Sequence, residues 1–185
     1  DVRKVPREVE NRLIEDLVVA DRHDPSGVLT APHPHWRFRS LHGWRLADTE
    51  HFRMQGYAAK IRALSFTRRG QFLATGGADT VICWPFTGGG PMGKAPVDFG
   101  GLLNGPPVTC VLSNPKLDVV AAGFEDGRVV IGQPGSQKVI TVSGPAEDTD
   151  GAAITAFAWT PAGDRLITGS ESGTVHVVDF RALLE

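Results

Sequence analysis

Histidines are the first residues in this sequence whose chemistry stands out, because five of the six fall between residues 23 and 51. They are His23, His33, His35, His42 and His51. His33 and His35 are spaced to lie on one side of an extended segment. Imidazole nitrogens are common zinc ligands, so this segment is a candidate metal-binding site. No cysteine is nearby and the spacing fits no structural zinc pattern. Solvent-exposed linker histidines are therefore the favoured interpretation, and no metal ligands are assigned.

A glycine-rich run, residues 88–95, matches most of the phosphate-binding loop G-x-x-x-x-G-K-[ST]. That loop requires backbone N–H groups around the phosphates, a following helix and a hydroxyl for magnesium. Ala95 supplies no hydroxyl, Pro91 removes an N–H and Pro96 argues against a helix. The run is interpreted as a flexible loop, and no cofactor is expected.

The remaining chemical groups indicate no catalytic set. The acids of residues 147–150 are too few for a calcium loop, which needs more oxygen ligands at set intervals. Glu171 occupies the central position of a G-x-S-x-G frame, so the nucleophile is missing. Cys83 and Cys110 fall in apolar runs typical of small buried side chains. The chain is therefore predicted not to be an enzyme.

Composition excludes two classes of partner. Nineteen Lys and Arg against twenty-one Asp and Glu give a net charge of −2, which is unlike a strongly basic nucleic-acid binder. No apolar run approaches the roughly 20 residues that cross a bilayer. Two cysteines cannot form a disulfide framework and favour a reducing compartment, so a cytoplasmic location is expected. A hydrophobic fraction of 41% is sufficient for a globular core.

The chain divides near Ser40, because residues 1–40 contain one glycine and the rest contain twenty-one. Apolar residues recur every four positions from Val5 to Leu17, which predicts a helix over 6–19. Pro6 suits the first helical position. Residues 1–40 are therefore predicted to be a helix plus irregular linker, without blade character.

Residues 41–185 contain an internal repeat. Three segments align without gaps at intervals of 47 and 46 residues: 61–76, 108–123 and 154–169. Each gives an apolar strand, a turn, a second strand, a glycine, a tight turn and a third strand. Candidate fourth strands lie between the repeats, at 50–56, around 95–99 and at 137–142. Four short strands per 40–50 residues are the signature of a propeller blade, with repeats near 50–87, 95–133 and 137–181.

The third repeat makes a family resemblance specific. Its Pro161-Ala162-Gly163-Asp164 turn, Glu171-Ser172-Gly173-Thr174-Val175 turn and terminal Val178-Asp179 resemble the WD-repeat (Trp-Asp) β-propeller family. Val178-Asp179 stands where that family often has Trp-Asp. The resemblance covers residues 41–185. More narrowly, residues 41–54 and 84–94 look like the C-terminal blades of alphaproteobacterial WD-repeat proteins.

The resemblance also implies a hydrogen-bonded tetrad of His, Ser/Thr, Asp and Trp inside a blade. Tyr57 stands near the histidine position of the first repeat, and Thr75, Asp79 and Trp84 match the other three members. The tetrad is therefore incomplete. These blades are expected to depend on apolar packing more than on a polar network.

The predicted fold is all-β, an incomplete β-propeller arc of about three WD-type four-stranded blades after an N-terminal helix or irregular segment. Seven blades of about 45 residues need about 315 residues, so the chain is expected to be the C-terminal part of a larger propeller. An open arc exposes an apolar blade face and an unpaired strand edge, which gives it a route to self-association.

The function predicted from the resemblance is a non-catalytic WD-repeat scaffold for protein–protein interaction. In such a propeller, the loops entering first strands and the turns joining second to third strands gather on one face. The residues expected there to bind a partner are Tyr57, Lys60, Arg62, Asp79, Phe124, Glu125 and Glu171. Phe124 has two open interpretations, an interface anchor or a core residue against the next blade. The alternative function is a metal-binding accessory protein that uses the histidine-rich segment 23–51.

Overall fold

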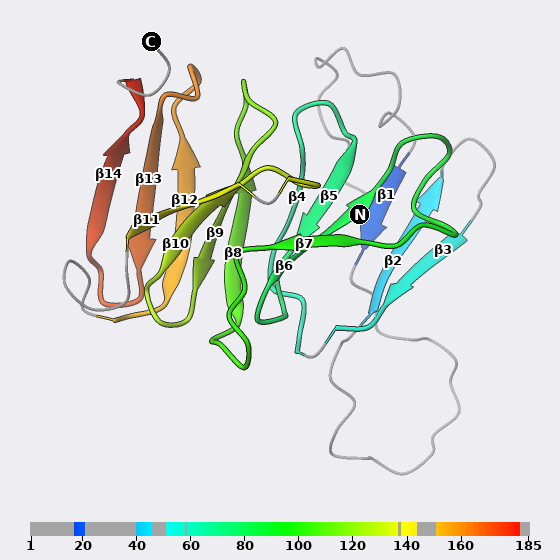
Figure 1. Cartoon of the computed structure of the whole chain (residues 1–185), viewed down its shortest axis with the longest axis horizontal. Coiled ribbons are helices and arrows are strands. Elements are labelled where there is room, and N and C mark those ends of the chain that lie inside the picture. Colours follow the sequence, from blue (N-terminus) through cyan, green and yellow to red (C-terminus); the bar gives the residue numbers. More distant parts are fainter. Residues whose placement is uncertain are drawn as a thin grey trace, which may run out of the picture.

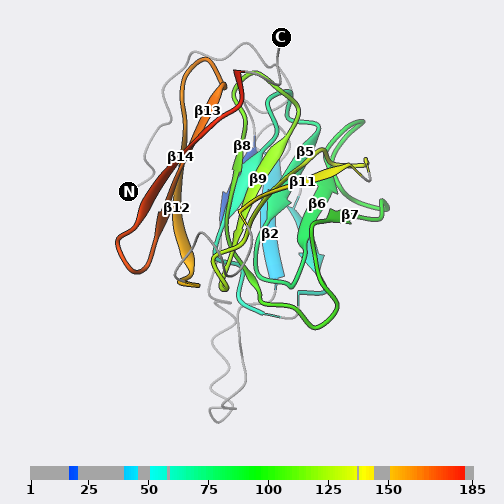
Figure 2. The same cartoon turned by 60° about the vertical axis from the view of Figure 1, so that its left-hand side comes forward.

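The computed structural model describes residues 17–20, 40–45, 51–57, 59–136, 138–143 and 151–181, with only the backbone described at 17–20. Within these residues every regular element is a β-strand, and the strands form four antiparallel sheets. The sheets lie side by side in chain order (Figure 1). A second view shows the last sheet at one end of the row (Figure 2).

Strand order within each sheet follows the chain. Sheet A contains β1 (Leu17–Ala20), β2 (Ser40–Arg45) and β3 (His51–Gln55). Sheet B contains β4 (Leu64–Phe66), β5 (Phe72–Thr75), β6 (Val81–Pro85) and β7 (Val97–Phe99). Sheet C contains β8 (Val108–Ser113), β9 (Val120–Phe124), β10 (Val129–Gly132) and β11 (Val139–Ser143). Sheet D contains β12 (Ile154–Trp159), β13 (Arg165–Ser170) and β14 (Val175–Asp179).

The architecture confirms the predicted all-β propeller blades. Each repeat supplies the first three strands of one sheet, and the segment between repeats supplies the outer strand of the sheet before it. Thus β7 pairs with β6 and β11 pairs with β10. The expected fourth strand at 50–56 corresponds to β3, which pairs with β2 in sheet A.

The predicted helix over 6–19 is wrong at its end, because β1 begins at Leu17 and pairs antiparallel with β2. Residues 17–20 read Leu-Val-Val-Ala, a continuous apolar run with two β-branched residues that fits a buried strand. Residues before position 41 thus contribute a strand to sheet A, although they were predicted to lack blade character. The rest of the predicted helix and linker lies outside the described residues.

The hydrophobic core consists of three clusters, one at each junction between neighbouring sheets. Strand alternation divides β5 between two of them: Leu73 packs toward sheet A and Ala74 toward sheet C. In the same way Val120 packs toward sheet B and Ala121 toward sheet D. Each internal sheet therefore buries both faces, which is how small sheets of this size become stable.

A glycine near the end of the second strand sets the distance between blades. A Cβ on Gly76 would lie 3.1 Å from the carbonyl oxygen of Val108 in the next sheet. A Cβ on Gly123 would lie 2.6 Å from the Cβ of Ile154. The third equivalent, Gly169, meets only Ala156 of its own sheet, at 3.5 Å. Among the described residues, no further sheet packs on this face of sheet D.

Candidate functional site

The turns between second and third strands gather at the lower edge of the molecule in Figure 1, beside the chain entering the first strands. We call this edge the turn face and define it as residues 59–62, 77–80, 100–107, 125–128, 151–153 and 171–174. Backbone hydrogen bonds hold its segments together. Glu125 N donates to Pro107 O at 3.1 Å, and Glu171 N donates to Ala153 O at 2.8 Å.

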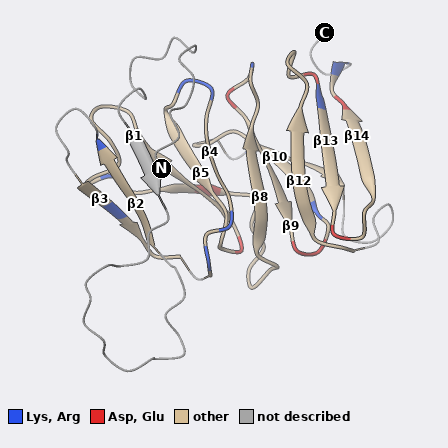
Figure 3. Cartoon of the chain, turned by 180° about the vertical axis from the view of Figure 1, so that it is seen from behind, with Lys and Arg blue, Asp and Glu red and all other residues tan. Residues whose placement is uncertain are grey.

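The charged residues expected to bind a partner all lie on the turn face. Lys60, Arg62, Glu125 and Glu171 are exposed, whereas Asp79 is partly buried. Figure 3 shows acidic segments in the β5–β6, β9–β10 and β13–β14 turns, with a basic segment in the chain entering β4. The face therefore carries acidic residues in each of the three turns and basic residues beside β4.

Tyr57 was also expected to bind a partner, but its side chain is buried in the core between sheets A and B. Its hydroxyl lies 2.9 Å from Thr75 Oγ1 and accepts a hydrogen bond from Trp84 Nε1 at 2.6 Å. Burial raises the pKa of Tyr57 above its ordinary value. Tyr57 thus contacts Thr75 and Trp84, two of the residues matched to the tetrad, and this polar network forms around a phenol.

Phe124 also lies in the core, which decides between its two interpretations in favour of packing. It belongs to the cluster between sheets B and C. The guanidinium carbon of Arg128 lies 3.7 Å from its ring centroid, within cation–π range. Arg128 Nη1 donates to Gly100 O at 2.8 Å, so the same side chain also ties the β7–β8 loop to the β9–β10 turn.

The most exposed apolar group on the turn face is one that the sequence interpretation missed. Leu103, at the tip of the β7–β8 loop, is 94% exposed, and its neighbour Leu102 is 53% exposed. The sequence feature that could have indicated this exposure is the pair of turn-forming segments around the two leucines. Gly100-Gly101 precedes them and Asn104-Gly105-Pro106-Pro107 follows them. Such residues mark a tight, projecting turn.

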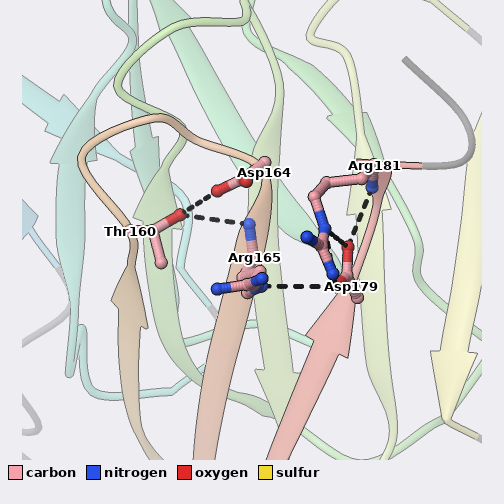
Figure 4. A network of polar contacts seen from close by, with 5 residues as sticks. All are labelled: Thr160, Asp164, Arg165, Asp179 and Arg181. Atoms are coloured by element: carbon pink, nitrogen blue, oxygen red, sulfur yellow. Dashed lines mark hydrogen bonds and ion pairs between the residues drawn. The ribbon is translucent and has the colours of Figure 1, made fainter. Parts of the chain in front are cut away.

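The opposite edge of sheet D carries a polar network that Figure 4 shows at close range. Arg165 Nε and Arg181 Nη2 contact Asp179 Oδ2 at 3.2 and 2.6 Å. Hydrogen bonding to Arg181 is the main reason that the pKa of Asp179 lies well below its ordinary value. Nearby, Thr160 Oγ1 donates to Asp164 at 2.5 Å and likewise lowers the pKa of that carboxyl. These contacts join the start of β13 to the end of β14.

The histidine-rich segment is described only at His42 and His51, since His23, His33 and His35 lie outside the described residues. His42 Nδ1 and His51 Nε2 are 3.0 Å apart on neighbouring strands of sheet A. Their rings stack, and Trp44 lies beside them. Within the described residues, no group of three His, Cys, Asp or Glu side chains is arranged to hold a metal ion.

The glycine-rich run forms a loop between β6 and β7, as expected. Lys94 Nζ donates to the carbonyls of Thr87 and Gly90 within that loop. Arg45 Nη2 donates to Gly89 O at 2.5 Å. The lysine that would contact phosphate in a nucleotide-binding loop is thus bonded to backbone oxygens of its own loop.

The two cysteines are unpaired. Cys83 is buried between sheets B and C, and Cys110 is partly buried beside sheet D. Burial raises the pKa of Cys83 to about 12 and that of Cys110 to about 11. Both are therefore neutral thiols near pH 7 and poor nucleophiles. In the described part of the chain, no helix is long and apolar enough to span a membrane.

Comparisons with known proteins agree with this architecture. A model described as WD domain, G-beta repeat, matches residues 49–84, and a model of the anaphase-promoting complex subunit 4 WD40 domain matches residues 111–182. None of the curated proteins matches the sequence.

Two solved structures show the same fold at low identity. The β-propeller domain of Cps50 (Swd1) from Myceliophteria thermophila has a TM-score of 0.57 and 20% identity, over 77% of this chain and 46% of that chain. The computationally designed Ika4 protein has a TM-score of 0.56 and 18% identity, over 76% of this chain and 79% of that chain. The chain thus spans less than half the length of the Cps50 chain.

Blade-like sheets, the repeat register and these structural likenesses define a β-propeller fold. The two matching repeat models support assignment of the chain to the WD-repeat family.

Proposed function

We propose that this chain is a non-catalytic scaffold that binds a protein partner through its turn face. The observation that carries this proposal is the turn face itself, where the turns of sheets B, C and D meet. That face combines exposed charges such as Lys60 and Glu125 with the exposed leucines 102 and 103. Mixed charge around an apolar centre is typical of a protein interface. A protein partner in the bacterial cytoplasm, without nucleic acid or membrane, is part of the proposal.

We further propose that the chain is the C-terminal part of a larger propeller, and the open face of sheet D supports this. In sheet C, Ala121, Val129 and Ile131 are covered by Ile154 and Leu166 of the next sheet. Their repeat equivalents in sheet D are Ile167, Val175 and Val177.

The two valines are 64% and 63% exposed. Within the described residues β14 also has no strand on its outer side. An apolar face with a free strand edge is suited to receive another blade, which in the proposed parent protein comes from the same polypeptide. In the isolated chain the same face provides a route to self-association.

Native mass spectrometry of the chain isolated from its own cytosol tests the scaffold proposal. Co-isolation with another protein at a fixed ratio is the expected result. Reversing the charge of Glu125 and Glu171, both exposed on the turn face, should then weaken the complex. A chain that carries stoichiometric zinc and no protein would contradict the proposal and favour the metal-binding role of segment 23–51. Large heterogeneous self-assemblies would show that the isolated chain associates with itself through the open face of sheet D instead of binding a partner protein.

A further inference from the structure

The β7–β8 loop projects from the turn face and presents an apolar side chain at its tip. It is the long loop that extends below β8 in Figure 1. Leu103 is more exposed than any other large hydrophobic residue in the described part of the chain. An isolated exposed leucine on a surface is ordinary, so its significance depends on how it is held.

A tight turn places Leu103 at the corner of the loop. Gly105 N donates to Leu102 O at 2.8 Å, which closes a four-residue turn from Leu102 to Gly105. Asn104, the third residue, has a φ of 56°, a left-handed conformation that asparagine tolerates better than other non-glycine residues. Leu103 is the second residue of this turn, and its 94% exposure shows that its side chain points away from the protein. Two prolines follow and restrict the backbone further.

The base of the loop is fixed by contacts on both sides. A Cβ on Gly101 would lie 2.6 Å from the Cβ of Thr80, so the loop packs directly on the β5–β6 turn. On the other side, Arg128 Nη1 donates to Gly100 O and Glu125 N donates to Pro107 O. The base of the loop that carries Leu103 is therefore held in place by contacts with the two neighbouring turns. Ordering a side chain before binding reduces the entropy that association must overcome.

The turns on both sides of this loop are acidic. Asp79 belongs to the β5–β6 turn that the loop contacts, and Glu125 and Asp126 belong to the β9–β10 turn. Figure 3 shows acidic segments on either side of the loop tip. The one arginine of the β9–β10 turn, Arg128, is buried against Phe124. The loop therefore lies between two turns that carry acidic residues.

We propose that Leu103 is the anchor of the turn face and inserts into an apolar pocket of a partner protein whose rim carries lysine or arginine. This inference rests on the proposed scaffold function and specifies the chemistry of its partner. A basic rim complements Asp79, Glu125 and Asp126, which would steer association and fix its orientation. Binding energy concentrates in side chains that fill desolvated pockets near the centre of an interface, which is the position proposed for Leu103.

A membrane surface is the competing target for an exposed leucine tip, and the charges argue against it. Cytoplasmic leaflets are negatively charged and attract basic segments. The carboxylates beside this tip would be repelled by such a surface. Leu102 and Leu103 alone also bury little area compared with an amphipathic helix that binds lipid.

Site-specific crosslinking tests the proposal. The full chain is prepared with a diazirine analogue of leucine at position 103 and irradiated in cytosol from its own cells, and the crosslinked protein and residue are identified by mass spectrometry. That protein is then purified and titrated with the unmodified chain and with Leu103→Ser, Leu103→Met and Met92→Ser. Met92 is the matched control, because it is 59% exposed on the β6–β7 loop, away from the turn face. Thermal unfolding confirms that each variant folds.

The expected crosslink is to an apolar residue flanked by Lys or Arg. Leu103→Ser should weaken binding at least about tenfold, while Leu103→Met and Met92→Ser bind as the unmodified chain does. Glu125→Lys should slow association and reduce its salt dependence.

Other results overturn the proposal in distinguishable ways. If a protein co-isolates but Leu103→Ser binds it equally well, the anchor is wrong and the scaffold function stands. If no protein co-isolates with the unmodified chain, the scaffold function fails as well. Crosslinking to lipid, or Leu103-dependent binding to vesicles of phosphatidylcholine and phosphatidylserine, would replace the partner protein with a membrane.

Discussion

The guanidinium group of Arg128 lies over the ring of Phe124, with its carbon 3.7 Å from the ring centroid. Both side chains are buried, and Arg128 also donates to the carbonyl of Gly100. One arginine therefore joins a core aromatic of sheet C to the loop that follows sheet B. This arrangement couples the position of the projecting loop to the packing between two blades.

We predict that Arg128→Ala destabilises the fold by about 1–3 kcal/mol, because Gly100 O loses its donor and Phe124 loses the charge above its ring. The measurement is urea unfolding followed by tryptophan fluorescence. Arg69→Ala is the control, since Arg69 makes an exposed ion pair with Asp118 at 3.5 Å. Such pairs contribute about 0–1 kcal/mol. Equal effects of the two substitutions would contradict the role given to Arg128.

We predict that Tyr57→Phe lowers the free energy of unfolding by about 1–2 kcal/mol. The ring still fills the core, but Trp84 Nε1 loses its acceptor and Thr75 loses one partner. Trp84→Phe provides the second arm of a double-mutant cycle. Because both changes remove one shared hydrogen bond, their effects should be less than additive. Additive effects would show that the two groups do not interact in solution.

We predict that substitution by alanine has different effects on stability at two glycines in equivalent positions of the repeat, Gly123 and Gly169. Gly123→Ala forces a methyl group to within 2.6 Å of Ile154 Cβ, so it should destabilise the junction between sheets C and D by about 1–3 kcal/mol. Gly169→Ala meets only Ala156, at ordinary contact distance, and should be neutral or slightly stabilising. Thermal melts of the two variants compare the sites directly. A strong loss at Gly169 would indicate that another sheet covers this face.

The thiols provide a prediction about pH. The raised pKa values of Cys83 and Cys110 mean that the folded protein holds both as neutral thiols, whereas the unfolded chain ionises them near pH 8.5. Their contribution to stability is therefore unchanged at lower pH and declines as pH rises from about 8.5 toward the folded values. Cys83→Ala and Cys110→Ala should each reduce this alkaline loss. A native protein labelled by a thiol reagent at pH 8 as fast as in urea would contradict the buried assignment.

The sequence was most informative where local backbone chemistry dominates. Gly70 and Gly163 adopt positive φ in the turns predicted from their positions, and the strands that flank those turns were placed within a few residues. Side-chain burial was harder to predict, because it depends on which sheet stands opposite. Tyr57 was expected on the surface and Phe124 was left open between surface and core, and both lie between sheets. Leu103 was overlooked because periodicity identifies strands and does not report how far a loop projects.

Residues 17–20 show a second reason why sequence patterns can fail to predict structure. A four-residue apolar spacing and a short apolar run are both compatible with helix and strand, and pairing with β2 decides between them. That pairing joins segments more than twenty residues apart, so a local window cannot detect it.

The core is divided into separate clusters, one between each pair of neighbouring sheets, and this division affects the unfolding pathway. Each cluster draws its side chains from two adjacent sheets, so the molecule behaves as a linear chain of coupled units in which each senses its immediate neighbours. Opening is then easiest from an end, and sheet D, which within the described residues is joined to the rest through one face, should be less protected than the internal sheets B and C. Amide exchange should accordingly rise from β9 to β14 as a gradient along the row.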